Sequence, residues 1–192
     1  MALPPAAPDR QHRHGRRIDV QVYARPDGLW EVDATITDIK ARDWKLAGGV
    51  LPAGTPLHDM LLRLVVDTDM QVVAAGAESR WTPYPGECDA YGDAYAALVG
   101  LNLRRGFRRA VQERLGGVRG CTHITELAQL LPTAVIQAFV GEVSDARSRN
   151  PASEQPPFQL DRCHALRRDG EVVRLHYPKW HHRAADEPGA VA

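Results

Sequence analysis

The sequence predicts an α+β fold, in which an antiparallel sheet of β-hairpins carries three helices on one face and a further hairpin follows near the C-terminus. Strand patterns come first: segments in which apolar and polar residues alternate dominate the chain before residue 80. Helical patterns follow up to residue 142, where apolar residues recur three and four positions apart. Because strands and helices are segregated along the chain, a layered α+β arrangement is favoured over βαβ units.

Composition fits one domain of this kind. The chain has 192 residues, of which 44% are hydrophobic, so it can bury a substantial core. Its 24 basic and 24 acidic residues balance, so overall charge argues neither for nor against a nucleic-acid partner, and none is expected. There is no run of eighteen apolar residues and no signal-peptide pattern, which predicts a soluble, cytoplasmic protein without a membrane partner. Three scattered cysteines fit a reducing compartment.

The main domain is predicted over residues 18–142 and begins with a hairpin. Residues 18–24 and 29–38 are its strands, because β-branched and aromatic residues alternate with polar ones in both. Asp27-Gly28 between them is typical of a tight turn. The preceding residues 1–17 are rich in proline, arginine and histidine and have nothing to bury, so we expect a disordered arm there.

A second hairpin is predicted from residues 61–67 and 71–79, with its turn at residues 67–69. Between the two hairpins, residues 40–56 mix glycine, proline and charged residues. A connection of that length is functional or mobile in most compact domains. The two hairpins together supply the strands of the main sheet.

Three helices are predicted after the sheet. The first follows Cys88 and ends at Gly100, because Tyr91, Tyr95 and Leu98 recur at helical spacing. The second covers residues 103–115, where apolar residues repeat every four positions. The third begins near Thr122 and runs toward Gly141, and Pro132 should kink it or divide it in two.

The C-terminal part is predicted to be a linker, a hairpin and a tail. Residues 143–157 are polar and bounded by proline, which is typical of a linker. The hairpin at residues 158–180 is expected to pack on the main domain, with strands on either side of Asp169-Gly170. Residues 181–192 are expected to be a disordered tail.

Cys121 and His123 attract attention because they stand where the third helix begins. Thr122 is a suitable N-cap, and the free N–H groups of a first helical turn stabilise an anion. This would favour the thiolate form of Cys121, which is the form that binds metal or acts as a nucleophile. A lone cysteine at such a position is more often a small buried hydrophobe than a metal ligand.

Further candidate ligands stand at other elements. There is no G-x-S-x-G elbow, P-loop or C-x-x-C pair, so serine hydrolases and nucleotide kinases have no positive support. Zinc and iron–sulfur centres need thiolates, imidazoles and carboxylates brought together from rigid elements. The predicted metal ligands are Asp59, Cys88, Cys121, His58, His123 and Cys163.

The second predicted helix has an arginine-rich surface. Arg104, Arg105, Arg108 and Arg109 crowd the side away from its apolar row. Arginine clusters bind phosphate groups of nucleotides, coenzyme A or RNA. A helix also needs a solvated face, so phosphate binding is the weaker of the two interpretations.

The sequence resembles a bacterial family of unknown function, domain-of-unknown-function family 2889, over roughly residues 12 to 180. The resemblance is carried by RRIDVQVYARPDGLWEVDATITDIK, GTPLHDMLLRLVVDTD, GLNLRRGFRRAVQERLGGVRGCTHITEL and LDRCHALRRDGEVVRLHYP. It implies a family but no mechanism.

A fainter resemblance links residues 55–142 to iron–sulfur cluster scaffold proteins of the U type. The order is similar: two strands, a cysteine, a helix, a glycine, a helix, a cysteine and a helix. The resemblance implies that Asp59 in HDMLLRLVVD, Cys88 in PGECDAY and Cys121 in RGCTHITEL match three cluster ligands of that family.

One ligand of that pattern is missing, because Leu57 stands where the scaffolds carry their first cysteine. His58, His123 or Cys163 would have to complete the shell. The site would otherwise bind zinc in place of a cluster, or no metal at all.

Three functions therefore compete. The first is a metal-binding, scaffold-like protein, in which Cys88 and Cys121 are expected to meet in space. The second is a small enzyme of acyl thioester metabolism that uses Cys121 or the pair His58-Asp59. The third is a non-catalytic module with structural cysteines that binds a small molecule or a protein.

Overall fold

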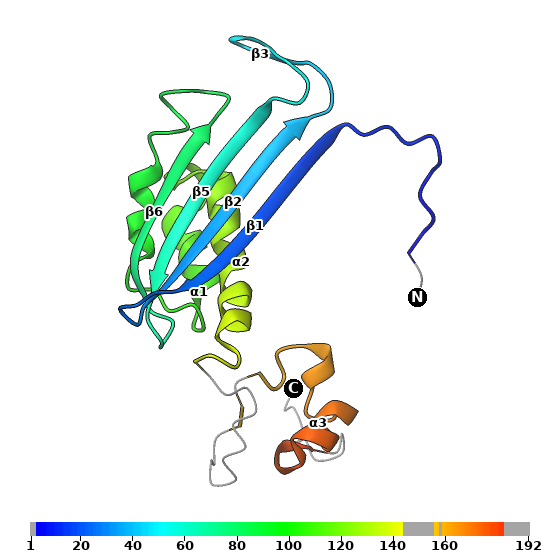
Figure 1. Ribbon diagram of the computed structural model, residues 1–192, viewed down its shortest axis with the longest axis vertical. Coiled ribbons are helices and arrows are strands. Elements are labelled where there is room, and N and C mark those ends of the chain that lie inside the picture. Colours follow the sequence, from blue (N-terminus) through cyan, green and yellow to red (C-terminus); the bar gives the residue numbers. More distant parts are fainter. Residues whose placement is uncertain (1–2, 144–155, 158, 183–192) are drawn as a thin grey trace, which may run out of the picture. The chain divides into compact units, whose positions relative to one another are not determined.

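The computed structural model describes residues 3–143, 156–157 and 159–182, and contains a four-stranded antiparallel sheet with helices on one face (Figure 1). The strand order is β1-β2-β5-β6. The strands are β1 (His14–Ala24), β2 (Trp30–Lys40), β5 (Pro56–Val66) and β6 (Val72–Trp81). The predicted α+β class is thus confirmed. The chain divides into two units, Met1–Ala138 and Phe139–Ala192, which are described separately below.

The hairpin of β1 and β2 is longer than the sequence predicted. Its turn contains Gly28 at φ 82°, a conformation that glycine adopts without steric cost, as Asp27-Gly28 indicated. Pairing extends back to His14, which lies opposite Lys40. The prediction of a disordered arm through Arg17 is therefore wrong from residue 14 onward. The reason is that β2 offers this polar segment a backbone ladder and an acidic partner, Asp38, described below.

The second hairpin joins β5 to β6, as predicted. The Asp67 carboxylate accepts hydrogen bonds from the backbone N–H groups of Asp69 and Gln71, both at 2.9 Å, and so fixes the turn. The connection between β2 and β5 contains a structure that the sequence did not predict. Two short strands, β3 (Trp44–Leu46) and β4 (Gly49–Leu51), form a separate small hairpin there.

The two faces of the main sheet differ sharply. Every second residue of the central strands is fully buried, namely Val32, Ala34 and Ile36 in β2 and Met60, Leu62 and Leu64 in β5. The opposite face carries polar pairs such as Arg63 with Asp33, whose Nε and Oδ1 atoms lie 2.6 Å apart. Because side chains alternate between the faces of a strand, Asp38 and His58 belong to the buried face.

The helices of the first unit follow in chain order. They are the 3₁₀ helices η1 (Gly92–Leu98) and η2 (Gly117–Arg119) and the α-helices α1 (Phe107–Leu115) and α2 (Thr122–Phe139). The predicted apolar row of Leu103, Phe107, Val111 and Leu115 is buried. The second predicted helix begins four residues late, because Gly106 caps α1 in the left-handed conformation at φ 65°.

Two other helix predictions need correction. The helix α2 continues through Pro132, so of the two expected effects of this proline, a kink or a division into two helices, the division is wrong. Cys88 lies in a run of turns before η1 and not at a helix start, because Pro83, Pro85 and Gly86 disfavour helix there.

The second unit contains no predicted hairpin within its described residues. It holds η3 (His164–Leu166), α3 (Glu171–His176) and η4 (Pro178–Trp180). A strand was predicted after Asp169-Gly170, but Gly170 caps a short helix there, whose first turn pairs Glu171 with Arg174. The predicted linker and tail lie almost entirely outside the described residues, which omit 144–155 and 183–192.

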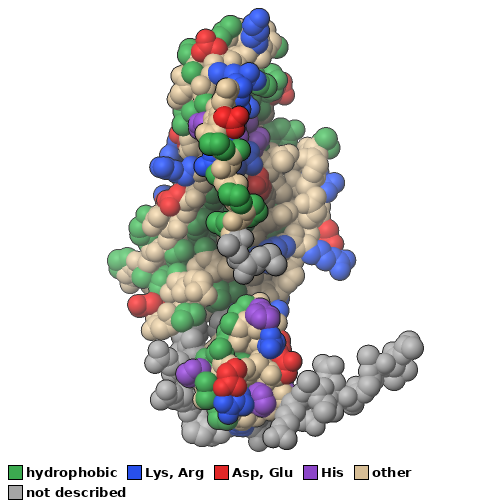
Figure 2. Space-filling view, turned by 90° about the vertical axis from the view of Figure 1, so that its right-hand side faces the viewer, with side chains coloured by type: hydrophobic (Ala, Val, Ile, Leu, Met, Phe, Trp, Pro, Cys, Tyr) green, Lys and Arg blue, Asp and Glu red, His purple; other side chains and the backbone are tan. Residues whose placement is uncertain are grey.

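The surface is mixed in charge. Figure 2 shows acidic and basic side chains interspersed over the face that it draws, with histidine side chains among them. This agrees with the balance of 24 basic and 24 acidic residues. Across the described ranges, the helices are too short or too polar to span a membrane.

Candidate metal centre

A buried carboxylate, Asp38, lies near the end of β2. Only 1% of its side chain is exposed, so its charge requires close partners. Arg16 lies directly opposite on β1 and donates from Nε to Oδ1 at 2.8 Å and from Nη2 to Oδ2 at 2.9 Å. His58 lies directly opposite on β5, with Nδ1 2.9 Å from Oδ2. His14 Nε2 lies 3.1 Å from Oδ1.

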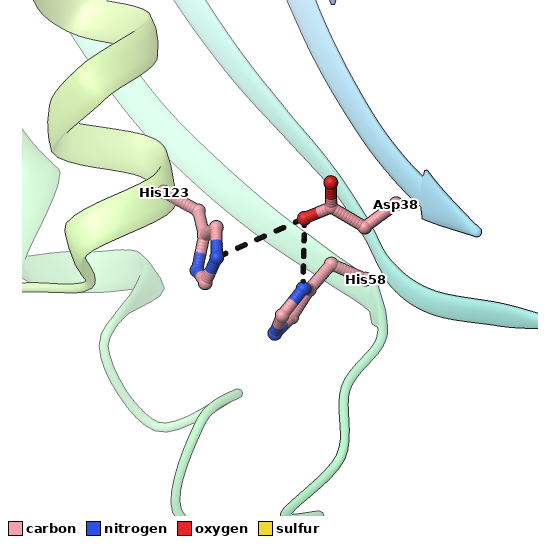
Figure 3. Close-up of side chains that lie close together, drawn as sticks. All are labelled: Asp38, His58 and His123. Carbon is pink, nitrogen blue, oxygen red and sulfur yellow. Dashed lines mark hydrogen bonds and ion pairs between the residues drawn. The ribbon is translucent and has the colours of Figure 1, made fainter. Parts of the chain in front are cut away.

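His123 joins this cluster from the first turn of α2. Figure 3 shows the imidazole rings of His58 and His123 facing each other beside one carboxylate oxygen of Asp38. The ring centroids lie 3.9 Å apart, and His123 Nε2 is 3.8 Å from Asp38 Oδ2. One potential ligand atom from each of the three residues lies within 4.8 Å of the other two. Three separate elements, β2, β5 and α2, thus bring together one carboxylate and two imidazoles.

The start of α2 is fixed by a buried polar network. The hydroxyl of Tyr95, which is fully buried, donates to the Cys121 carbonyl at 2.8 Å and lies 3.0 Å from Thr125 Oγ1. Thr125 Oγ1 in turn donates to the Leu115 carbonyl at 3.2 Å. Burial raises the pKa of Tyr95 to about 12, so the hydroxyl stays protonated and able to donate. These contacts tie the first turn of α2, and with it His123, to η1 and to the end of α1.

Arg16 connects the cluster to the surface of α2. Its Nη1 donates to Glu126 Oε2 at 2.8 Å while the rest of the guanidinium binds Asp38. One positive charge is therefore shared between two carboxylates. With neutral histidines, Asp38, Glu126 and Arg16 leave the cluster with a net negative charge.

The environment sets the protonation states of the cluster. Burial alone would raise the pKa of Asp38, but hydrogen bonds from Arg16 and His58 outweigh it and bring the pKa to about 2. Burial lowers the pKa of His58 below its usual 6.5, against the opposing effect of Asp38. At neutral pH, Asp38 is therefore ionised and His58 is neutral, and these are the forms that coordinate metal ions.

Cys121 lies beside His123, as the sequence predicted for residues at one helix start. Its Sγ is 3.8 Å from His123 Nδ1. Burial would raise the pKa of this thiol, but the contact with His123 and the N–H groups of the first helical turn outweigh burial and lower it.

The other predicted ligands are placed differently. Asp59 lies on the opposite face of β5 from His58, because neighbouring residues of a strand alternate between faces. Cys88 lies in the turns before η1, and burial raises the pKa of its thiol. Cys163 is exposed in the second unit. In the part of the chain that the structure describes, the grouping of three such ligands consists of Asp38, His58 and His123.

Sequence reasoning missed the centre of this cluster. Asp38 continues the alternation of Val32, Ala34 and Ile36, so the pattern itself placed a carboxylate on the buried face. That was the available signal, because a charged residue at a buried strand position needs an ion-pair partner or a metal. Arg16 and His14 carried no such signal.

The arginines of the second predicted helix largely make contacts within the chain. Arg108 donates to the Gln129 carbonyl at 2.9 Å and to Thr133 Oγ1 at 3.1 Å, which ties α1 to α2. Arg109 pairs with Glu113 at 2.7 Å. Arg104 and Arg105 precede α1. Phosphate binding by these four residues stays a prediction.

Comparison with known proteins gives a family for this chain. A family model described as "Protein of unknown function (DUF2889)" matches residues 14–137. The match begins at the first residue of β1 and includes Asp38, His58 and His123. No curated protein and no solved structure matches the chain. The resemblance to iron–sulfur scaffold proteins thus stays an expectation.

Proposed function

The chain belongs to the DUF2889 family, and from the geometry of its site we propose that it is a metal-binding protein that holds a divalent transition-metal ion, such as Zn²⁺, through Asp38, His58 and His123. The observation that carries this proposal is the convergence of three ligand atoms within 4.8 Å of one another. Their residues come from two strands of a sheet and the start of a helix, which are rigid elements suited to holding a site.

The spacing of the donors suits a small ion. Donors about 2.0–2.1 Å from a tetrahedral zinc ion lie roughly 3.3 Å from one another. The Asp38 Oδ2 atom lies 2.9 Å from His58 Nδ1 and 3.8 Å from His123 Nε2, so the two separations bracket that value. Shifts of about half an ångström would therefore bring these two separations to the value for a shared ion.

The chemical types of the donor atoms limit which metals the site can bind. Two imidazoles and one carboxylate suit zinc and iron(II), and three protein ligands leave a coordination position for water or a substrate. An iron–sulfur cluster is disfavoured, because such clusters are held mainly by thiolates. This ligand set keeps His58 and His123 from the sequence-based prediction, replaces Asp59 with Asp38, and leaves out the predicted cysteine ligands Cys88, Cys121 and Cys163.

The surroundings of Asp38 support binding of a cation. Arg16 fixes the carboxylate through two hydrogen bonds and so orients the remaining lone pair of Oδ2 toward His58, as outer partners of metal ligands commonly do. Its positive charge would oppose a metal ion, but Glu126 offsets it. A divalent ion would replace the His58–Asp38 hydrogen bond by two coordinate bonds.

Calorimetric titration of the full chain with Zn²⁺, after removal of any histidine tag, tests the proposal. We expect one tight site, and we expect His58→Gln and His123→Gln each to weaken it by at least about 100-fold, because each removes a ligand. The matched control is His182→Gln, which makes the same change at an exposed histidine of the second unit. Equal Zn²⁺ affinity in all four proteins would contradict the proposal.

A further inference from the structure

A second group of donor atoms lies beside Asp38, His58 and His123 and faces the other nitrogen of the His123 ring. Cys121 Sγ lies 3.9 Å from Met60 Sδ and 3.8 Å from His123 Nδ1. Met60 follows His58 on the buried face of β5, and Cys121 immediately precedes α2. The strand β5 and the chain at the start of α2, which supply the two imidazoles, therefore also supply two sulfur atoms.

We propose that Cys121, Met60 and His123 form a binding site for a soft monovalent cation, Cu(I). Thiolate and thioether sulfur select Cu(I), whereas hard cations avoid thioethers. The site goes beyond the divalent site, because it uses different donors and only shares His123, through the opposite ring nitrogen. The oxygen donor of Asp38 thus lies on one side of the His123 ring, and the sulfur donors of Cys121 and Met60 lie on the other.

The donor separations match those of atoms that share one ion. Two sulfur donors, each about 2.3 Å from a three- or four-coordinate ion, lie roughly 3.8–4.0 Å apart, and a sulfur and a nitrogen donor, the latter at about 2.0 Å, lie roughly 3.5–3.7 Å apart. The distance of 3.9 Å from Cys121 Sγ to Met60 Sδ falls within the first range, and the distance of 3.8 Å from Cys121 Sγ to His123 Nδ1 is just above the second. A Cu(I) ion would therefore enter without a large movement of β5 or α2.

Burial also suits Cu(I). Met60 is fully buried and Cys121 is partly buried, so the site excludes most water. Cu(I) accepts two or three soft ligands and requires none of the bound water that Mg²⁺ retains. The rival explanation is that Cys121 and Met60 merely pack together as core side chains, and the following experiment separates the two.

The test measures Cu(I) affinity under anaerobic, reducing conditions by competition with the chromophoric chelator bicinchoninate. The starting protein is the full chain with Cys88→Ser and Cys163→Ser, so that Cys121 is its single thiol. Into it we introduce Cys121→Ser or Met60→Leu, and as a control Met70→Leu, which makes the same change at another buried methionine. Leucine preserves the volume of methionine and removes the sulfur.

We expect the starting protein and Met70→Leu to bind one Cu(I) ion. Cys121→Ser should weaken binding by at least about 100-fold and Met60→Leu by at least about tenfold, because thiolate is the stronger soft ligand. Circular dichroism of Met60→Leu should match the starting protein, and its Zn²⁺ affinity should be unchanged. The proposal would be overturned if the starting protein bound no Cu(I), or if Met60→Leu bound Cu(I) as tightly as the starting protein does. Neither result depends on whether Zn²⁺ binds.

Discussion

Replacing Asp38 with alanine is expected to lower the free energy of unfolding of the metal-free protein by about 3 kcal/mol. The carboxylate is 1% exposed and bonded to Arg16 and His58, with His14 close by. Its removal leaves the partly buried Arg16 guanidinium without its main acceptor and opens a space at the end of the sheet. The loss stays at the lower end for buried ion pairs because Arg16 is 33% exposed and keeps Glu126. Urea unfolding measures the change.

Asp33→Ala is the matched control for this prediction. Asp33 lies on the same strand and binds Arg63 through two hydrogen bonds of 2.6 Å, but the pair is on the exposed face of the sheet. Exposed ion pairs contribute less than about 1 kcal/mol, because water and salt screen them. Equal losses of stability in the two variants would show that burial of Asp38 has no special importance.

Zinc is expected to raise the melting temperature of the protein by roughly 10 °C when its free concentration is about 1,000 times the dissociation constant. A ligand that binds the folded state alone stabilises it by mass action, here by about 4 kcal/mol. The unfolded chain cannot bring Asp38, His58 and His123 together, because 20 and 65 residues separate them along the sequence, from 58 − 38 and 123 − 58. Differential scanning calorimetry with and without zinc measures the shift.

Two comparisons test whether the shift in melting temperature comes from zinc bound at the proposed site. His123→Gln should lose most of the shift, whereas His182→Gln should keep it. Mg²⁺ at the same concentration should produce little change, because imidazole is a poor ligand for a hard cation. A zinc-induced shift that survives His123→Gln would instead indicate binding by other histidines, such as His12 or His181.

The sheet was predictable because its pattern is local. Alternation in residues 29–38 and 61–67 reports burial of one face directly, and Asp27-Gly28 identifies the turn. The C-terminal hairpin was predicted wrongly for the same reason. Val172 and Val173 have strand propensity. The six-residue segment that contains them buries one side chain, Val173, so the Gly170 cap and the Glu171–Arg174 pair determine its conformation and make it a helix.

The candidate site was only half predictable. Cys121 and His123 were singled out because a helix start can be recognised in the sequence. His58 was singled out because it stands just before a predicted strand. Asp38 was missed because its importance depends on the pairing of β2 with both β1 and β5, which is nonlocal. Arg16 belongs to a polar segment that forms a strand only through this pairing, so no local pattern indicated it.

The most direct test of the metal site is an anomalous difference map from crystals of the zinc-loaded protein, recorded at the zinc absorption edge. The account predicts one strong peak within about 2.2 Å of Asp38, His58 and His123 ligand atoms. A peak only at Cys88 or Cys163, or no peak in protein that retains an ordered His58–Asp38 hydrogen bond, would contradict it.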